Sequence, residues 1–170
     1  MMIGAMDIHR ELLAREIPHE IVRLPRVVLN AMELPEALRV PASQCVATRI
    51  YYLDEVPTAV AVPALSTPEP GAILAALDAL TLRPATVEQT NALTGYAAGL
   101  VSAALLPKDI PLFIDARLDM TGVVYLPTGE TGTAIGISGA TFFRLTGARL
   151  AHLVDVDVIE LPYDLSQLRL

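Results

Sequence analysis

The sequence has few of the residues on which several familiar classes of site depend. Its single cysteine, Cys45, excludes an internal disulfide, and alone it makes neither a cysteine-type metal site nor a redox pair. No G-x-S-x-G, P-loop, G-x-G-x-x-G or H-E-x-x-H motif occurs, which excludes the chemistries that depend on them. The three histidines, His9, His19 and His152, show no metal-ligand spacing. We therefore expect neither a metal nor a cofactor.

Long apolar runs are also absent. Apolar residues make up 53% of the chain, but proline, glycine or charge interrupts every run before the roughly 18 residues that a membrane span needs. The N-terminal stretch MMIGAMDIHRELLARE carries acids and arginines where a secretion signal needs an apolar core. These patterns predict a cytoplasmic protein that does not enter a membrane.

Positive charge is scarce. The net charge is -7, and the cations are isolated arginines together with one lysine, Lys108. Tight binding of nucleic acid depends on neutralising phosphates, so the composition disfavours a DNA-binding protein. A local group of arginines could still contact an RNA end.

The 170 residues suffice for one domain with a substantial core. Hydrophobic periodicity and turn residues predict helices at 6–16, 33–39, 71–80, 87–93 and 140–147. They predict strands at 17–24, 45–53, 58–65, 110–116, 122–127, 132–138 and 149–156, with a short strand near Leu82 and a turn around Asp54, Glu55 and Pro57.

The predicted strands do not alternate strictly with helices. A mixed α/β (α+β) domain, with a mixed sheet or partial barrel flanked by short helices, therefore fits better than a doubly wound fold. We assign this domain to residues 1–154 and a C-terminal extension to residues 155–170. For the extension, an edge strand, a docking helix and an oligomer contact remain alternatives.

The segment LTGYAAGLVSAALLPKDIPLFID, residues 93–115, gathers small residues ahead of a strand that ends at Asp115. Gly95 and Gly99 permit close approach of the backbone to a bound group, and consecutive N–H donors in such a loop can hold an anion or oxyanion. The same glycines could instead serve only to end a helix and form a turn.

The pattern T-G-Y-x-x-G-x-x-S, followed by an apolar strand ending in I-D, resembles the YbaK/EbsC-type aminoacyl-tRNA deacylases, relatives of the editing insertion domain of bacterial prolyl-tRNA synthetase. The stretches REIPHEIVRLP, LPEALRV, SQCVATRIYY and TGETGTAIGISGATFFRLTGARLAHL resemble other parts of this family, in the same order. The resemblance covers residues 8–154.

The resemblance implies a metal-free hydrolase that cleaves the ester joining a wrong amino acid to the terminal ribose of a tRNA. Proline-specific tRNA carrying cysteine or alanine is the common substrate. Such a reaction needs oxyanion donors, a pocket sized to the amino acid, and a nucleophile from water or from the substrate. The implied partners are the 3′ end of aminoacyl-tRNA and prolyl-tRNA synthetase, and a homo-oligomer is left open.

Two positions depart from the family pattern. The family has lysine before threonine on its central strand, whereas this chain has Ala47 before Thr48, and the family's G-x-x-x-P turn runs here from Gly99 to Ala103. Strand alternation places Arg49 on the same face as Ala47, so its guanidinium could replace the missing cation. It would not deliver a proton at neutral pH. Alternatively, Arg49 is a strand-edge charge that faces solvent.

We predict catalytic roles for Arg49 and Ser102, and substrate binding by Ala47, Thr48, Gly95, Tyr96, Gly99, Asp115, Gly129 and Gly132. Ser102 lacks an adjacent histidine and is therefore expected to donate a hydrogen bond, not to act as a nucleophile. Asp115 holds the substrate ammonium or caps the next turn. Gly129 and Gly132 form a second pocket wall or an ordinary hairpin turn.

Two functions follow from these residues. One is a trans-editing deacylase for mischarged tRNA of the prolyl type. The other is a catalytically inactive relative that binds an amino acid, nucleotide or protein partner in the same pocket, which Ala47 and Ala103 favour. A fold without a pocket between residues 45–52 and 95–102 would indicate an unrelated domain.

Overall fold

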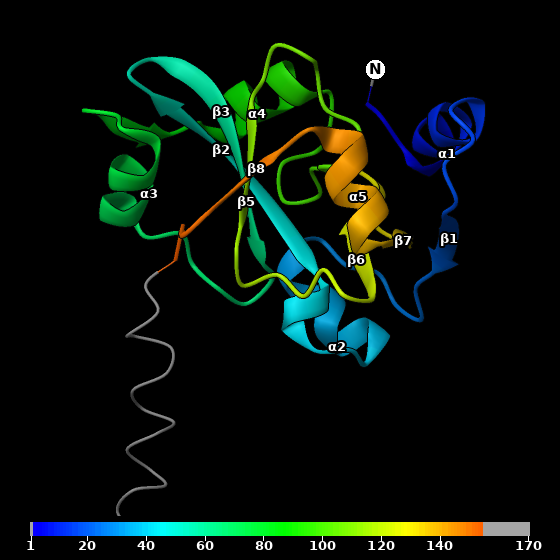
Figure 1. Ribbon diagram of the computed structural model, residues 1–170. Coiled ribbons are helices and arrows are strands. Elements are labelled where there is room, and N and C mark those ends of the chain that lie inside the picture. Colours follow the sequence, from blue (N-terminus) through cyan, green and yellow to red (C-terminus); the bar gives the residue numbers. More distant parts are fainter. Residues whose placement is uncertain (1, 155–170) are drawn as a thin grey trace, which may run out of the picture.

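The computed structural model describes residues 2–154, which form two β-sheets with helices packed around them (Figure 1). The larger sheet has the order β4-β2-β3-β5-β8 and contains β2 (Val46–Leu53), β3 (Val56–Pro63), β4 (Leu82–Pro84), β5 (Leu112–Asp115) and β8 (Arg149–Ala151). Its β3–β5 and β5–β8 pairs are parallel and the others antiparallel. The smaller, antiparallel sheet has the order β1-β7-β6, with β1 (Glu20–Arg23), β6 (Val123–Pro127) and β7 (Thr133–Ser138).

The helices are α1 (Ala5–Ala14), α2 (Leu34–Leu38), α3 (Pro70–Leu77), α4 (Val87–Thr94) and α5 (Gly139–Thr146), with 3-10 turns at Ala31–Glu33 and Ala42–Gln44. The predicted mixed α/β fold is confirmed, although its strands divide between two sheets. A bridge between Cys45 and Tyr125 connects them. Within residues 2–154, no helix is long and apolar enough to cross a membrane.

Several element ends differ from the prediction for local reasons. The first strand begins only at Glu20, because Glu16 adopts a left-handed φ of 57° and Ile17 donates back to Leu12 as α1 ends. Helix α3 ends at Leu77, because Asp78 has φ 53°. The last strand ends at Ala151, and the remaining residues, 155–170, lie outside the described part of the chain.

The β2–β3 hairpin has a tighter turn than predicted. Asp54 and Glu55 alone form it, both with positive φ, and Pro57 already pairs with Tyr52 inside β3. Such two-residue turns match the right-handed twist of the flanking strands. The Asp54 carboxylate accepts hydrogen bonds from the amides of residues 80 and 81 at 3.0 and 2.9 Å, which lowers its pKa and anchors the turn beside β4.

Strand β2 is buried on both faces, apart from the exposed Arg49 and the half-buried Tyr52. Val46 and Ile50 pack in one hydrophobic cluster, while Ala47 and Tyr51 pack in a second one on the opposite face. Because period-two alternation separates the faces, Arg49 belongs to the side of Ala47. This confirms the predicted placement of Arg49 relative to Ala47.

Helix α4 leads into the segment that shapes the site. The Thr86 hydroxyl accepts from the Gln89 amide at 3.1 Å and the Gln89 side chain accepts from the Thr86 amide, which forms a capping box. The helix ends at Gly95, with φ 80°, as predicted. Residues 96–111 then run without a helix or strand to β5.

Candidate active site

A cavity of about 240 Å³ lies at the edge of β2, where the sequence predicts the pocket. Its lining comes from residues 30–32, 47–51, 84–85 and 98–99, together with Thr90 and Val101. The cavity thus brings together the central strand and the glycine-containing loop, two segments far apart in the sequence. An unrelated fold without a pocket at this position is thereby excluded.

The backbone of β2 is open toward this cavity. The Ile50 carbonyl accepts a hydrogen bond of 3.0 Å from the Ala85 amide, so the polar backbone groups of Ile50 point away from β3. In an antiparallel strand, every second residue directs its N–H and C=O to the same side, which gives Thr48 the same direction. Strand β4 pairs only with Tyr51–Leu53 and ends before it reaches Thr48. The amide and carbonyl of Thr48 therefore face the cavity.

The Thr48 side chain adds a polar group at the same place. Thr48 is 7% exposed and lines the cavity, and its hydroxyl is buried without a hydrogen-bond partner among residues 2–154. A buried hydroxyl without a partner costs about 1–3 kcal/mol, so such groups in folded proteins call for an explanation. Thr48 thus buries an unsatisfied polar group next to the cavity wall.

Gly99 forms the opposite wall and must be glycine. Its φ is 91°, and its carbonyl accepts a hydrogen bond of 2.9 Å from the Ala31 amide. A Cβ atom at this position would lie 3.0 Å from the Leu29 carbonyl oxygen. The Ala98 amide donates to the Asn91 side chain at 2.8 Å, so α4 holds the loop in place. The close approach of two backbone segments thus shapes this wall.

Arg49 lines the cavity but is itself exposed to solvent. One of its terminal nitrogens, Nη2, lies 3.9 Å from the Met32 sulfur. Burial raises the pKa of the Tyr51 hydroxyl, and the neighbouring Arg49 guanidinium opposes part of that rise. The guanidinium therefore lies at the rim, beside Tyr51, and Ala47 leaves the interior without a cation.

The lining contains no aspartate, glutamate, histidine or lysine. Its side-chain polar groups are those of Asn30, Thr48, Arg49, Tyr51 and Thr90. None of these is a general acid or base at its ordinary pKa near neutral pH. The arrangement is suited to binding and orienting a polar group by hydrogen bonds.

Three predicted site residues of the loop lie behind the cavity wall. Gly95 ends α4, and Tyr96 is buried in the core, where its hydroxyl donates to the Leu105 carbonyl at 2.7 Å. Burial raises the pKa of Tyr96, and Ser102 nearby opposes part of this rise. Ser102 is fully buried, does not line the cavity, and its hydroxyl has no partner within residues 2–154.

The structure also separates Asp115, Gly129 and Gly132 from the cavity. The buried Asp115 carboxylate accepts from the amides of Leu153 and Arg117, at 2.8 and 3.0 Å, so it holds the turn after β5 and the chain after β8. Gly129 has φ 90° and a Cβ there would collide with the Ile3 carbonyl, while the Gly132 carbonyl accepts from Leu24.

Sequence analysis missed Asn30 and Thr90 as lining residues. The Asn30 side chain accepts a hydrogen bond from the Met32 amide at 2.9 Å and so caps the 3-10 turn. An asparagine ahead of a helical segment is a common N-cap, and this pattern could have placed Asn30 at the start of the turn. It also missed the contact between His9 Nδ1 and His19 Nε2, at 2.8 Å. Residues 2–154 contain no group of three or more potential metal ligands.

Cys45 is a fully buried core residue, and burial raises the pKa of its thiol to about 12. The thiolate, which is the reactive form, is therefore strongly disfavoured at neutral pH. Cys45 lies outside the cavity lining, as its role as a small core residue requires.

Comparison with solved structures shows the same fold in proteins of low sequence identity. The hypothetical protein APE2540 is 23% identical, with a TM-score of 0.78 over 87% of this chain and 99% of its own. A protein proposed to be a trans-editing enzyme for prolyl-tRNA synthetase is also 23% identical, with a TM-score of 0.72 over 81% of this chain and 87% of its own. No curated protein sequence matches the chain.

The family model for the aminoacyl-tRNA editing domain matches residues 26–145, which include β2, Thr48, Gly99 and every other residue of the cavity lining. The match spans more than half of the 170 residues. The chain belongs to the aminoacyl-tRNA editing domain family, of the YbaK type.

Proposed function

We propose that this protein is a trans-editing deacylase, which hydrolyses the ester of mischarged tRNA of the prolyl type carrying cysteine or alanine. The observation that carries the proposal is the cavity at the open backbone edge of β2, next to which Thr48 buries a hydroxyl without a partner among residues 2–154. Membership of the editing domain family supports deacylation in general. The choice of the prolyl type rests on the resemblance of the sequence to the YbaK/EbsC-type deacylases.

The size of the cavity fits this substrate. At about 240 Å³ it lies below the roughly 300–1,000 Å³ of pockets for drug-sized ligands. A small amino acid and its ester group would enter, while the rest of the tRNA would remain outside. Arg49 at the rim is placed to meet a phosphate or ribose oxygen of the terminal nucleotide, and a guanidinium suits such oxygen atoms.

In this proposal, the chain contributes positioning and hydrogen-bond donors to the reaction. The amide and hydroxyl of Thr48 would bind the ester carbonyl oxygen, on which negative charge develops as a water molecule adds to the carbonyl carbon. The bond to the ribose oxygen then breaks and that oxygen takes up a proton, which yields free amino acid and tRNA. With no acid or base in the lining, the nucleophile would be activated by the substrate itself.

A second candidate function is favoured by Ala47. Ala47 occupies the position of the family lysine and presents only a methyl group to the cavity. The nearby cation, Arg49, lies at the rim and is exposed to solvent. Losing one catalytic donor typically costs about 10²–10³-fold in rate. The alternative is therefore a catalytically inactive family member that binds an amino acid, nucleotide or protein partner in this cavity.

The proposed partners are the 3′ end of aminoacyl-tRNA and prolyl-tRNA synthetase, in the cytoplasm. A net charge of -7 predicts weak, salt-sensitive binding of tRNA alone. A synthetase that holds the tRNA body would compensate for that weakness.

Deacylation of Cys-tRNA and Ala-tRNA for proline tests the proposal, with the wild type compared with Thr48→Val, Arg49→Ala and Ala47→Lys. Arg10→Ala is the matched control, since Arg10 lies on α1 with only a 3.8 Å contact to Asp7. We expect wild-type turnover that falls at least about tenfold in Thr48→Val and Arg49→Ala. Activity that appears only in Ala47→Lys would establish the inactive alternative.

A further inference from the structure

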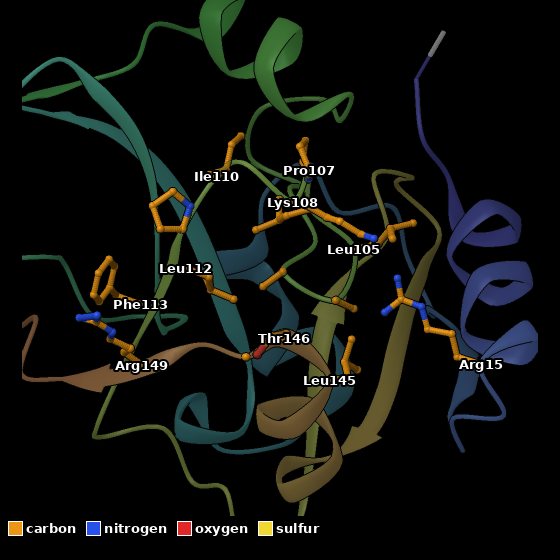
Figure 2. Close-up of a pocket in the computed structure, with 15 residues that line it drawn as sticks. Arg15, Leu105, Pro107, Lys108, Ile110, Leu112, Phe113, Leu145, Thr146 and Arg149 are labelled. Atoms are coloured by element: carbon orange, nitrogen blue, oxygen red, sulfur yellow. The ribbon is translucent and has the colours of Figure 1, made fainter.

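A second cavity, of about 440 Å³, is lined in part by a later stretch of the loop that helps to form the first one (Figure 2). Residues 103–108 of this loop line the second cavity, whereas Ala98, Gly99 and Val101 line the first. The remaining walls come from residues 110–113, from residues 145–147 at the end of α5, from Arg149 at the start of β8, and from Arg15 after α1. No residue is shared between the two linings.

The floor of the second cavity is apolar. It contains Leu105, Ile110, Leu112 and Leu145, which approach the space from the loop, from β5 and from α5 (Figure 2). Phe113 also lines the cavity, but it packs against the hydrophobic cluster on the opposite face of β5 from Leu112. A volume of 440 Å³ falls within the roughly 300–1,000 Å³ of small-molecule pockets. An apolar group of several carbon atoms would lose its contact with water on this floor and would bind favourably.

The rim of the same cavity is cationic. It carries Arg15, Arg149 and Lys108, the only lysine of the chain, and no acidic side chain belongs to the lining. In Figure 2 the Lys108 side chain extends along the cavity toward the side of Arg15, and Arg149 stands beside Phe113 on the other side. This is a local excess of positive charge on a chain whose net charge is -7.

The rim cations are only partly neutralised by neighbouring acids. Glu11 accepts from Arg15 Nε at 2.8 Å, and no hydrogen bond or ion pair within residues 2–154 engages the two terminal nitrogens of Arg15. Lys108 has no carboxylate within 4.0 Å among the described residues, although Asp109 follows it in the chain. Arg149 lies over the Phe113 ring at 5.9 Å and has no such acid either within residues 2–154.

We propose that this second cavity binds a small organic anion. The carboxylate or phosphate of the ligand would lie between Arg15 and Lys108, and its hydrocarbon part would lie on the apolar floor. Both parts of the ligand follow from the lining: the cations select the charged group, and the floor selects the hydrocarbon. An extended RNA backbone fits this concave, apolar surface less well, because phosphates and riboses offer little apolar area to it. The site is distinct from the proposed editing pocket and does not depend on deacylase activity.

Binding there has a structural consequence for the first cavity. The two linings follow one another in the same loop, and the Tyr96 hydroxyl bonds the loop back to Leu105, a residue of the second floor. A ligand that contacts Leu105 and Lys108 would therefore restrict the segment that carries Gly99. The amide resonances of Gly99 and Val101 should report on occupancy of the second cavity.

The experiment measures binding of four probes to the full-length protein by amide NMR titration: octanoate, octyl phosphate, 1-octanol and inorganic phosphate. We expect both octyl anions to shift the amides of residues 103–112, with at least about tenfold tighter binding than octanol or inorganic phosphate, because only the octyl anions engage both the cations and the apolar floor. Lys108→Met and Arg15→Gln should each weaken octanoate by about fivefold or more. Arg10→Gln is the matched control, because Arg10 lies on α1, the helix that ends just before Arg15, and does not line the cavity. This substitution should leave the affinity unchanged.

Three results would overturn the proposal. Equal affinity for octanol and octanoate would show an apolar cavity without anion recognition. Equal affinity for inorganic phosphate and octyl phosphate would show a charged surface without a role for the floor. Absence of binding by both octyl anions, together with shifts at residues 103–112 on addition of a short RNA duplex, would make this face a nucleic-acid surface. Thermal unfolding of each variant verifies that it folds.

Discussion

The hydroxyl of Tyr96 donates a 2.7 Å hydrogen bond to the carbonyl of Leu105, and this bond closes the loop that separates the two cavities. Tyr96 itself is fully buried and packs where Gly129 leaves space for its ring. Gly99 lines the first cavity, and Lys108, later in the same loop, lines the second. A single phenol thus ties together the segments that line the two cavities.

Replacing this phenol by Phe tests that role. Tyr96→Phe leaves the Leu105 carbonyl without its partner, and we expect a loss of about 1 kcal/mol in the free energy of unfolding, at the low end for a partly buried group. Urea denaturation measures the loss. Tyr125→Phe is the control, because no hydrogen bond of the Tyr125 hydroxyl occurs within residues 2–154. Equal effects of the two substitutions would argue against a role for the hydroxyl.

Gly99→Ala should be more damaging than Gly147→Ala. Both glycines have positive φ, 91° and 62°, so each alanine carries the backbone strain of that region, roughly 1–2 kcal/mol. At Gly99 the new Cβ also meets the Leu29 carbonyl at 3.0 Å, whereas nothing lies within 4 Å at Gly147. We expect a lower melting temperature for Gly99→Ala and a loss of substrate binding. Identical melting temperatures would contradict the close approach of the two backbones.

Thr48→Val and Ser102→Ala compare the hydroxyl of a residue that lines the cavity with the hydroxyl of a residue that does not. Each substitution removes a buried hydroxyl without a partner in residues 2–154, so stability should stay within about 1 kcal/mol of the wild type or rise. Only Thr48 lines the cavity. We therefore expect deacylation or ligand affinity to fall in Thr48→Val and to persist in Ser102→Ala. A loss in Ser102→Ala alone would restore the catalytic role that the sequence suggested for Ser102.

Alkaline pH should destabilise the protein partly through Cys45. Burial raises the pKa of its thiol from 9.0 to about 12, so the folded state retains a proton that the unfolded chain releases. The stabilisation is fully present below pH 9 and is lost as pH rises toward 12. Urea midpoints at several pH values in this window should fall less steeply in Cys45→Ala than in the wild type. Parallel slopes for the two proteins would exclude a contribution from this thiol.

The sequence predicted the elements of the fold well because its local signals agree with one another. Thr86 and Gly95 mark both ends of α4, and the alternation of β2 placed Arg49 on the face of Ala47. It could not predict the division into two sheets, since that depends on pairing between distant strands such as β1 and β7.

The candidate site was predicted in part. Thr48 and Gly99 meet across the cavity, but Gly95, Tyr96 and Ser102 turn to the core side of the loop, although they belong to the same short pattern. This loop has no helix or strand, so its sequence has no periodicity that would show which residues face the cavity and which face the core. Asn30 lines the site because the next residue, Ala31, donates a hydrogen bond to the Gly99 carbonyl and holds the chain before α2 against the loop. Such a contact between distant segments leaves no local signal in the sequence.

The interrupted edge of β2 also bears on the solubility of the fold. A strand edge with free amides and carbonyls is normally a template for another strand, and hence a starting point for aggregation. Here β4 covers Tyr51–Leu53, and the segments around Met32 and Gly99 stand over the uncovered part. They narrow the uncovered part of the edge, which disfavours pairing with an incoming strand and leaves the Thr48 amide and carbonyl open to the cavity.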